Sequence, residues 1–217
     1  RNQGAAAARG DRLLFLDDDM LVDAALLARH HDAHTGPEPV LARATLLNLP
    51  WMRFVADPLR PDSSLPAGIL GRARALTPGE PDLRALAEGA RRSPFEADLH
   101  GLFAQRRDAP TGRWPAAASG NLSITSEAFA RVGGFDTRMG RRWGAEDLEF
   151  GFRAERAGLR VVHLDDVAAF HMDHAAPARD ADHAAALRHF RAVHGPVADR
   201  LEAYFSGSCT MLEVVGA

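Results

Sequence analysis

Three consecutive acids follow a short apolar run near the start of the chain. Asp17, Asp18 and Asp19 come directly after residues 12–16, a stretch that is too short for a helix and suits a buried strand. Side chains alternate along a strand, so Asp17 and Asp19 share one side and Asp18 points to the other. Paired carboxylates at a strand end favour a hard divalent cation such as Mg²⁺ or Mn²⁺, which prefers oxygen ligands. The alternative is an acidic turn that binds no metal.

A second acidic pair, Glu146 and Asp147, begins a predicted helix just after Trp143. Leu148 and Phe152 are four residues apart, which gives this helix one apolar side. In this position Asp147 could act as a general base that accepts a proton from an attacking hydroxyl, with Trp143 as an aromatic platform beside it. The alternative is structural, because the helix dipole stabilises acids in the first turn with or without catalysis.

Two further patterns could contribute to a site. Gly120 and Asn121 open a short predicted strand, and the glycine leaves room for a ligand to approach the backbone, although a plain strand start is the alternative. His171 ends another predicted strand, and His174 follows three residues later. Imidazole binds Mn²⁺ as well as softer metals, so a histidine here could complete a site begun by Asp19. A structural histidine is the alternative in a chain that has 10 of them.

The composition narrows the function classes. The formal net charge of −3 gives no broad basic field, so we expect no nucleic-acid partner. The sequence contains no lysine, which excludes Schiff-base lysine chemistry and a Walker lysine. The single Cys209 cannot form an internal disulfide, and we therefore expect a cytoplasmic location. No apolar run approaches the roughly 18 residues of a membrane span.

The motifs are set in alternating strands and helices. Strands are predicted at 12–16, 40–49, 119–125, 159–164 and 167–170, and helices at 24–34, 82–92, 95–107, 126–132 and 180–205. This alternation favours a mainly parallel α/β sheet with helices on both faces. Segment 50–80 is rich in proline and glycine and reads as a long irregular loop of the kind that is usually functional. In the helix that begins near Glu146, Glu149 and Arg153 should pair on the exposed side.

In this order and spacing, the motifs resemble family 2-like glycosyltransferases of the GT-A fold. The matching pieces are Arg1-Asn2-Gln3-Gly4 with Ala8–Asp11, Phe15–Asp19, Ser119–Ser123, Gly133–Asp136, Trp143–Asp147 and His171. The Trp-Gly-x-Glu-Asp block is also similar to the acceptor-side motif of galactosyltransferase-type relatives. The resemblance implies one catalytic domain over residues 1–217, with a variable acceptor-side segment at 50–110 and a C-terminal helical segment at 180–205.

One departure concerns the nucleotide. GT-A enzymes begin with strand-helix units that hold the base and ribose, and two such units of roughly 30 residues each would be expected before Arg1. The resemblance therefore implies an N-terminally incomplete GT-A-like fold, the catalytic and acceptor half of a longer protein. Nucleotide recognition is not assigned to any residue of this chain.

The resemblance implies an inverting, metal-dependent transfer from a nucleotide-sugar donor, expected to be a UDP-sugar, to a carbohydrate or small-molecule acceptor. Asp147 would be the catalytic base, and Glu146 and Trp143 would bind the acceptor. The implied donor-binding residues are Asp17, Asp18, Gly120 and Asn121. The implied ligands of Mn²⁺ or Mg²⁺ are Asp19, Asp17 and His171, with His174 as the weaker candidate.

Two other functions compete with this one. The Asp17-x-Asp19 pattern after a strand is also similar to haloacid-dehalogenase-like phosphatases, but these usually have Thr or Val where this chain has Leu21, and commonly a later lysine. A truncated remnant that binds carbohydrate or a partner chain without catalysis is the second alternative, because a fold does not imply a function.

The glycosyltransferase interpretation makes a geometric prediction. Asp19 and His171 should approach within about 5 Å, because one cation holds its ligands at roughly 2.0–2.6 Å. Asp147 should face the same opening without touching the metal pair, since a metal-bound base would be too weak. Without a common site, these three residues have no reason to converge.

Overall fold

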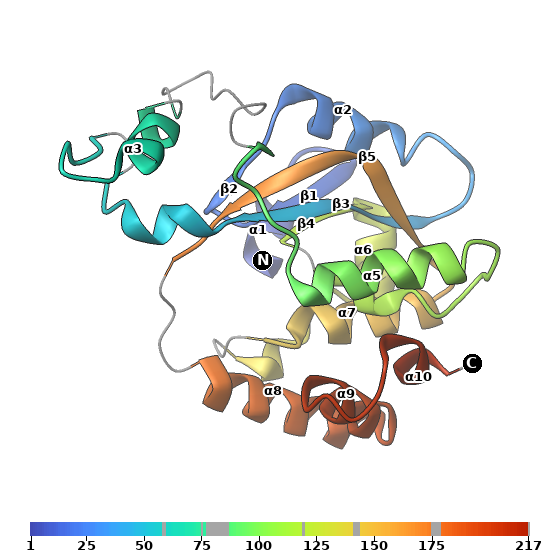
Figure 1. The fold of residues 1–217 in the computed structure, drawn as a ribbon. Helices are drawn as coiled ribbons and strands as arrows, with labels where there is room; N and C mark the ends of the chain where they lie inside the picture. The colour runs from blue at the N-terminus through green and yellow to red at the C-terminus, as the bar shows by residue number, and fades with distance from the viewer. Residues whose placement is uncertain are drawn as a thin grey trace.

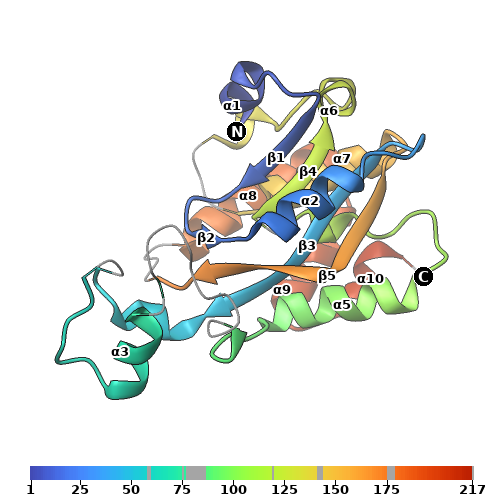
Figure 2. The ribbon, with the colours of Figure 1, turned by 90° about the horizontal axis from the view of Figure 1, so that it is seen from above.

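Five strands form one sheet at the centre of the molecule. The computed structural model describes residues 1–57, 60–74, 76, 87–118, 120–140, 144–174 and 179–216. Within these ranges the strands are β1 (Arg12–Leu16), β2 (Met20–Leu21), β3 (Val40–Leu49), β4 (Asn121–Thr125) and β5 (Arg160–Met172). Their order across the sheet is β1-β4-β3-β5-β2 (Figures 1 and 2).

The α/β class is confirmed, but the sheet is mixed rather than mainly parallel. Only β3 and β5 pair in parallel, whereas β1–β4, β3–β4 and β2–β5 are antiparallel among the described strands. β1, β3 and β5, on which the prediction rested, do run in one direction. β4 runs back between β1 and β3, with Asn121 opposite Leu16 and Thr125 opposite Arg12. The apolar pattern of a strand gives its faces and not its direction, so the sequence did not reveal this insertion.

The helices cover both faces of the sheet. Within the described ranges they are α1 (Asn2–Ala7), α2 (Ala24–Asp32), α3 (Ala67–Arg74), α5 (Pro94–Gln105), α6 (Ser126–Val132), α7 (Glu146–Arg156), α8 (Arg179–His194), α9 (Val197–Phe205) and α10 (Met211–Val215). Figure 1 shows α2 on one face, with α5 and α7 to α10 on the other. Asp23 begins α2 as predicted, because its carboxylate accepts a hydrogen bond from the Leu26 amide at 2.8 Å. Part of the helix predicted at 82–92, residues 82–86, lies outside the described residues.

Segment 50–80, in its described residues, is more ordered than a plain loop. It contains the short 3₁₀ helix η1 (Pro50–Phe54) and α3. Trp51 and Met52 of η1 form a small apolar core with Leu49 at the end of β3 and Phe170 of β5. The segment is therefore attached to the end of β5 that carries His171. The two strands predicted at 159–164 and 167–170 are one strand, β5.

Glu149 and Arg153 pair as predicted, but on the inner side of α7. Arg153 Nε donates to Glu149 Oε1 at 2.6 Å, and only 1% of the Glu149 side chain is exposed. The Nε2 atom of His194, at the end of α8, lies 2.8 Å from the same carboxylate oxygen. Because a buried carboxylate needs polar partners, these contacts explain how α7 can turn Glu149 toward α8.

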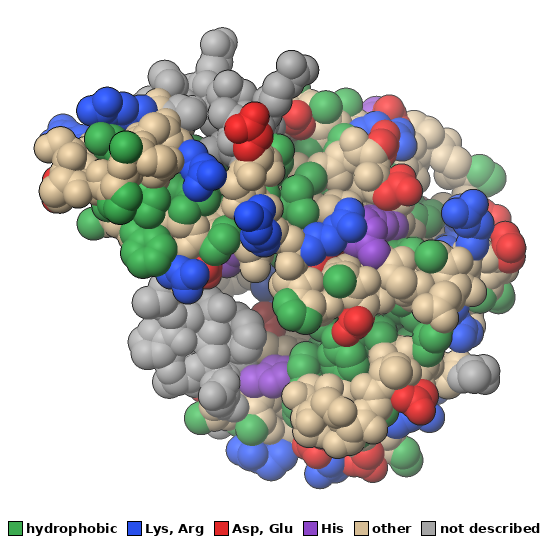
Figure 3. Space-filling view, in the orientation of Figure 1, with side chains coloured by type: hydrophobic (Ala, Val, Ile, Leu, Met, Phe, Trp, Pro, Cys, Tyr) green, Lys and Arg blue, Asp and Glu red, His purple; other side chains and the backbone are tan. Residues whose placement is uncertain are grey.

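The surface carries no single-sign charge field on the face shown in Figure 3, where basic and acidic side chains are interspersed. This agrees with the small net charge of −3.

No helix within the described ranges is both long and apolar enough to cross a bilayer.

Acid should destabilise the fold through His30. This side chain of α2 is 2% exposed and contacts the Ser123 hydroxyl at 2.8 Å, and burial lowers its pKa from 6.5 to about 4. Between these two values the unfolded chain binds more protons, so stability is present above pH 6.5 and is lost as the pH falls toward 4. The loss should reach about 3 kcal/mol.

Urea unfolding at neutral pH and near pH 4.5 measures this effect. The variant His30→Gln should lose clearly less stability on acidification than the wild type, whereas His31→Gln, at an exposed neighbouring position, should behave like the wild type. An equal loss in His30→Gln and the wild type would contradict the assignment.

Candidate functional site

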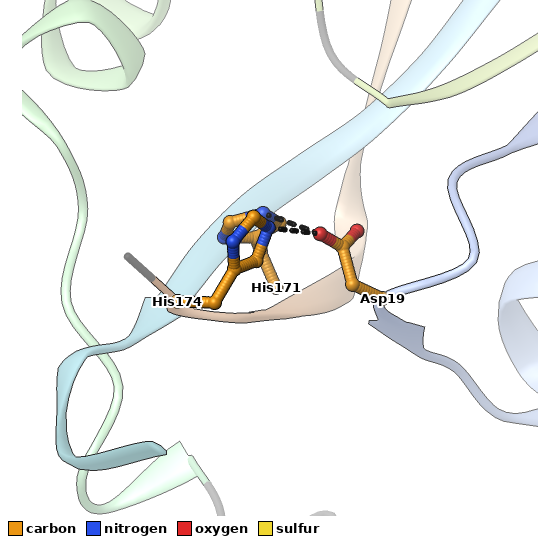
Figure 4. A group of neighbouring side chains, drawn as sticks. All are labelled: Asp19, His171 and His174. Carbon is orange, nitrogen blue, oxygen red and sulfur yellow. Dashed lines mark hydrogen bonds and ion pairs between the residues drawn. The ribbon is translucent and has the colours of Figure 1, made fainter. Parts of the chain in front are cut away.

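Asp19, His171 and His174 converge at the edge of the sheet. β2 pairs with β5 so that Met20 lies opposite His171, and the Met172 amide donates to the Asp19 carbonyl at 2.9 Å. One carboxylate oxygen of Asp19, Oδ2, lies 3.1 Å from His171 Nε2 and 3.0 Å from His174 Nε2. Figure 4 shows both rings directed at this oxygen. The predicted approach of Asp19 and His171 within about 5 Å is confirmed.

The chemistry of this group fits a divalent cation. The three candidate ligand atoms all lie within 4.8 Å of one another. The other carboxylate oxygen of Asp19, Oδ1, is buried and has no hydrogen-bond partner among the residues that the structure describes, which costs about 1–3 kcal/mol. One carboxylate and two imidazoles suit Mn²⁺ and other first-row divalent ions. Both histidines are therefore placed to act as ligands, although the sequence favoured His171 over His174.

Asp17 faces a different partner. Its carboxylate lies 3.7 Å from the Arg1 guanidinium, and Asp17 does not belong to the three-residue ligand group. Burial raises the pKa of Asp17, Arg1 opposes this shift, and Asp19 adds to it. Asp18 is exposed. In this structure Asp17 is therefore a neighbour of the ligand group, and a role in binding metal or donor stays a prediction.

Gly120 leaves space for Asp17. Its φ of +62° lies in the left-handed region, and a Cβ atom there would be 2.7 Å from Asp17 Oδ2 and 2.5 Å from Met20 Cε. The Asp17 amide donates to the Gly120 carbonyl at 3.0 Å. Glycine suits both the left-handed backbone and the close approach of these two side-chain ends.

Comparing substitutions of Gly120 and Gly133 should separate the cost of the left-handed backbone from the cost of the clash with Asp17. Gly120→Ala should lose about 1–2 kcal/mol from its left-handed backbone alone and more from the clash with Asp17. Gly133, with φ +88° and open space around its missing Cβ, is the matched control, because Gly133→Ala carries the backbone cost without a clash. Urea unfolding of both variants measures the difference. Equal losses would show that Asp17 moves aside freely.

Asp147 and Glu146 lie at the start of α7 and share one cation. Arg1 Nη1 lies 2.6 Å from Asp147 Oδ1 and 2.8 Å from Glu146 Oε1. Burial raises the pKa of Asp147 to about 7, with Arg1 acting in the opposite direction and Glu146 in the same direction. About a fifth of the Asp147 side chain, 21%, remains exposed. Sequence reasoning missed Arg1, whose only signal was its place in the Arg1-Asn2-Gln3-Gly4 motif.

Asp147 and Asp17 face one small hollow. Its volume is about 10 Å³, room for about one water molecule, and it is lined by Arg1, Phe15, Asp17, Ala117, Gly120, Leu122, Phe135 and Asp147. Asp19 and His171 both influence the pKa of Asp17 through their charges, so this hollow lies near the ligand group, although none of the three ligand residues lines it. A wider hollow, lined in part by His34, Thr125 and Arg131, lies at the opposite end of β4. The predicted base thus lies near the ligand group, at a hollow that Asp17 and Gly120 also line.

Two other predicted residues have different positions. Asn121 is fully buried, and its side-chain oxygen accepts a hydrogen bond from the Ala44 amide at 2.6 Å. This hydrogen bond joins the start of β4 to β3. The Asn121 side chain therefore points into the sheet and does not line the hollow in this conformation. Trp143 lies outside the described residues, as does Ser119 of the strand motif.

A second histidine group lies between α5 and the sheet. Glu96, His100 and His163 bring candidate ligand atoms within 4.8 Å of one another. However, the fully buried Arg43 donates to both oxygens of Glu96 at 3.0 and 2.7 Å. Burial is the main cause that lowers the pKa of His163, and the charge of Arg43 lowers it further. The guanidinium already neutralises the only carboxylate of this group, which makes it a poor cation site.

The comparisons with known proteins cover the later motifs best. Residues 104–175 match the model of a family described as the N-terminal domain of galactosyltransferase, a stretch that includes Asp147 and both histidines. The chain is also 25% identical over 197 residues to the uncharacterized glycosyltransferase YfnE of Bacillus subtilis (strain 168), covering 84% of this chain and 49% of that protein. The chain therefore spans about half the length of this relative. Both similarities support a glycosyltransferase.

Proposed function

We propose that this chain is the catalytic and acceptor-side part of an inverting, metal-dependent glycosyltransferase. The observation that carries the proposal is the convergence of Asp19 with His171 and His174, together with Asp147 at the nearby hollow. These residues come from distant parts of the chain, and packing alone gives no reason for polar groups of this kind to gather. The similarity to galactosyltransferase and glycosyltransferase sequences supports the same class of reaction.

Asp19, His171 and His174 are the residues that would hold the cation. Bound there, Mn²⁺ or Mg²⁺ supplies a Lewis acid that offsets the charge developing on a diphosphate leaving group. Asp17 and Gly120, which both line the small hollow, would lie against the donor sugar, which we propose to be part of a UDP-sugar. The protein would meet this donor in the cytoplasm, as expected from its cysteine content.

The acceptor would be activated by Asp147. Arg1 contacts Oδ1 of this carboxylate, so Oδ2 remains to accept the proton of the acceptor hydroxyl. The acceptor oxygen then bonds to the anomeric carbon from the face opposite the diphosphate. The bond between that carbon and the diphosphate oxygen breaks, and the anomeric configuration inverts. Glu146 and Trp143 are proposed to bind the acceptor, which is a carbohydrate or small molecule with a free hydroxyl.

The reaction should depend on the ionisation of Asp147. Its pKa is raised to about 7 by burial, and a base works only when it is ionised. Therefore kcat/KM should fall as the pH drops through about 7 and should level off above it. A pH–rate profile of the wild type, recorded with saturating metal, measures this. A profile that stays flat from about pH 5.5 to 8 would remove Asp147 as the titrating base.

A donor panel tests the proposal as a whole. The full-length protein is incubated with Mn²⁺, a set of nucleotide sugars and a mixture of saccharide acceptors, and release of the nucleoside diphosphate is followed. We expect release with at least one donor, its loss on addition of EDTA, and a glycosylated product. Binding of a saccharide without turnover would favour the non-catalytic remnant, and hydrolysis of simple phosphate esters would favour the phosphatase.

A further inference from the structure

We propose that Arg1 is a positioning residue that connects the donor side of the site to its acceptor side and fixes Asp147 for proton transfer. This inference rests on the proposed function. The guanidinium reaches three carboxylates: Nη1 lies 2.6 Å from Asp147 Oδ1 and 2.8 Å from Glu146 Oε1, and Nη2 lies 3.7 Å from Asp17 Oδ1. Asp17 belongs to the strand end and the other two acids to α7, more than a hundred residues later.

The protein holds this arginine in place. The next residue, Asn2, forms two hydrogen bonds with the backbone of Phe135: its amide nitrogen donates to the carbonyl at 2.8 Å, and its oxygen accepts from the amide at 2.9 Å. The Arg1 guanidinium also lies over the Phe135 ring, 5.2 Å from its centroid. Its side chain is only 31% exposed. These contacts distinguish Arg1 from an arginine that is free at the surface.

The Arg1 guanidinium offsets the repulsion between the three carboxylates that it contacts. Asp17, Glu146 and Asp147 face one another with like charges, and each raises the free energy of the others when ionised. A planar guanidinium can contact two groups through different nitrogens at fixed angles, whereas a lysine ammonium is a point charge on a flexible chain. Because Arg1 takes only Oδ1 of Asp147, it can set the orientation of this carboxylate and leave Oδ2 to the acceptor.

Kinetics of Arg1→Ala and Arg1→Lys in the full-length protein test the role. Misplacing a catalytic group by about 1 Å can cost about 100-fold in rate, so Arg1→Ala should lose about 100-fold in kcat with little change in the KM for the donor. Arg1→Lys should recover only part of this loss. Free guanidinium ion should restore part of the activity of Arg1→Ala and none of Asp147→Asn. Arg9→Ala, at an exposed arginine of the same segment, should match the wild type.

The outcomes separate this inference from the proposed function. Normal kcat in Arg1→Ala, beside an inactive Asp147→Asn, would overturn the role of Arg1 and leave the glycosyltransferase proposal standing. Absence of transfer by the wild type with every donor would contradict the proposed function and the positioning role of Arg1 with it. A crystal structure of Arg1→Ala gives a reading that needs no activity. The Asp147 carboxylate should turn away from its wild-type position, and an unchanged position would overturn the inference.

Discussion

Asp147→Asn in the full-length protein should abolish sugar transfer while metal-dependent nucleotide binding stays nearly intact. Asparagine keeps the shape of the side chain and can still receive a hydrogen bond from Arg1, but it cannot accept the proton of the acceptor. Loss of a general base typically costs about 10²–10⁴ in rate. The measurement is the rate of product formation at saturating donor and acceptor.

The matched control is Asp11→Asn. Asp11 is an acid at an exposed position, with 85% of its side chain accessible, and its neutralisation should leave the rate unchanged. Near-normal turnover by Asp147→Asn would remove this residue from the role of base. In that case Glu146, which shares the Arg1 cation, would be the next residue to neutralise.

Asp19→Ala should abolish both metal binding and transfer. Asp19 is the only carboxylate of the ligand group, and its Oδ2 atom is the point to which both imidazoles are directed. Replacing an outer-shell partner of a metal site commonly costs about 10–100-fold, so removal of a ligand itself should exceed about 100-fold. Titration of the apoprotein with Mn²⁺, followed by paramagnetic resonance, measures the affinity directly.

The two histidines can be ranked in the same experiment. His171 is held on β5 with 19% of its side chain exposed, whereas 50% of the His174 side chain is exposed. A less mobile ligand loses less entropy on binding, so His171→Ala should weaken Mn²⁺ binding more than His174→Ala. His31→Ala, at a position 60% exposed on α2, should bind Mn²⁺ like the wild type. Unchanged affinity in Asp19→Ala would contradict the site.

The sequence predicted the parts of the site that local rules determine. The bounds of β1 and β3, the Asp23 cap of α2 and the end of β5 close to His171 follow from apolar periodicity and capping chemistry. Even the approach of Asp19 to His171 was expected from the resemblance, although the antiparallel pairing of β2 with β5 that produces it was not. That pairing depends on which strand edges meet in three dimensions, and a two-residue strand leaves almost no signal in sequence.

Other features could not be predicted, because tertiary contacts decide them. Asn121 was expected to face the donor, but the need to satisfy the Ala44 amide turns its side chain inward. Glu149 was expected at the surface, but Arg153 and His194 together make its burial possible. Arg1 enters the site only because α1 returns to the turn at Phe135. In each case the partner lies far along the chain or on another element.

Calorimetric titration of Mn²⁺ and UDP into the wild type, Asp147→Asn and Asp19→Ala tests the central claim most directly, because it separates the metal ligands from the base. The claim is that Asp19 and the two histidines hold the cation for the nucleotide, and that Asp147 acts only on the acceptor. We predict that UDP binds the wild type and Asp147→Asn with nearly equal affinity when Mn²⁺ is present, and that Asp19→Ala loses this metal-dependent binding. Metal-dependent binding of UDP that persists in Asp19→Ala, or that disappears in Asp147→Asn, would contradict the claim.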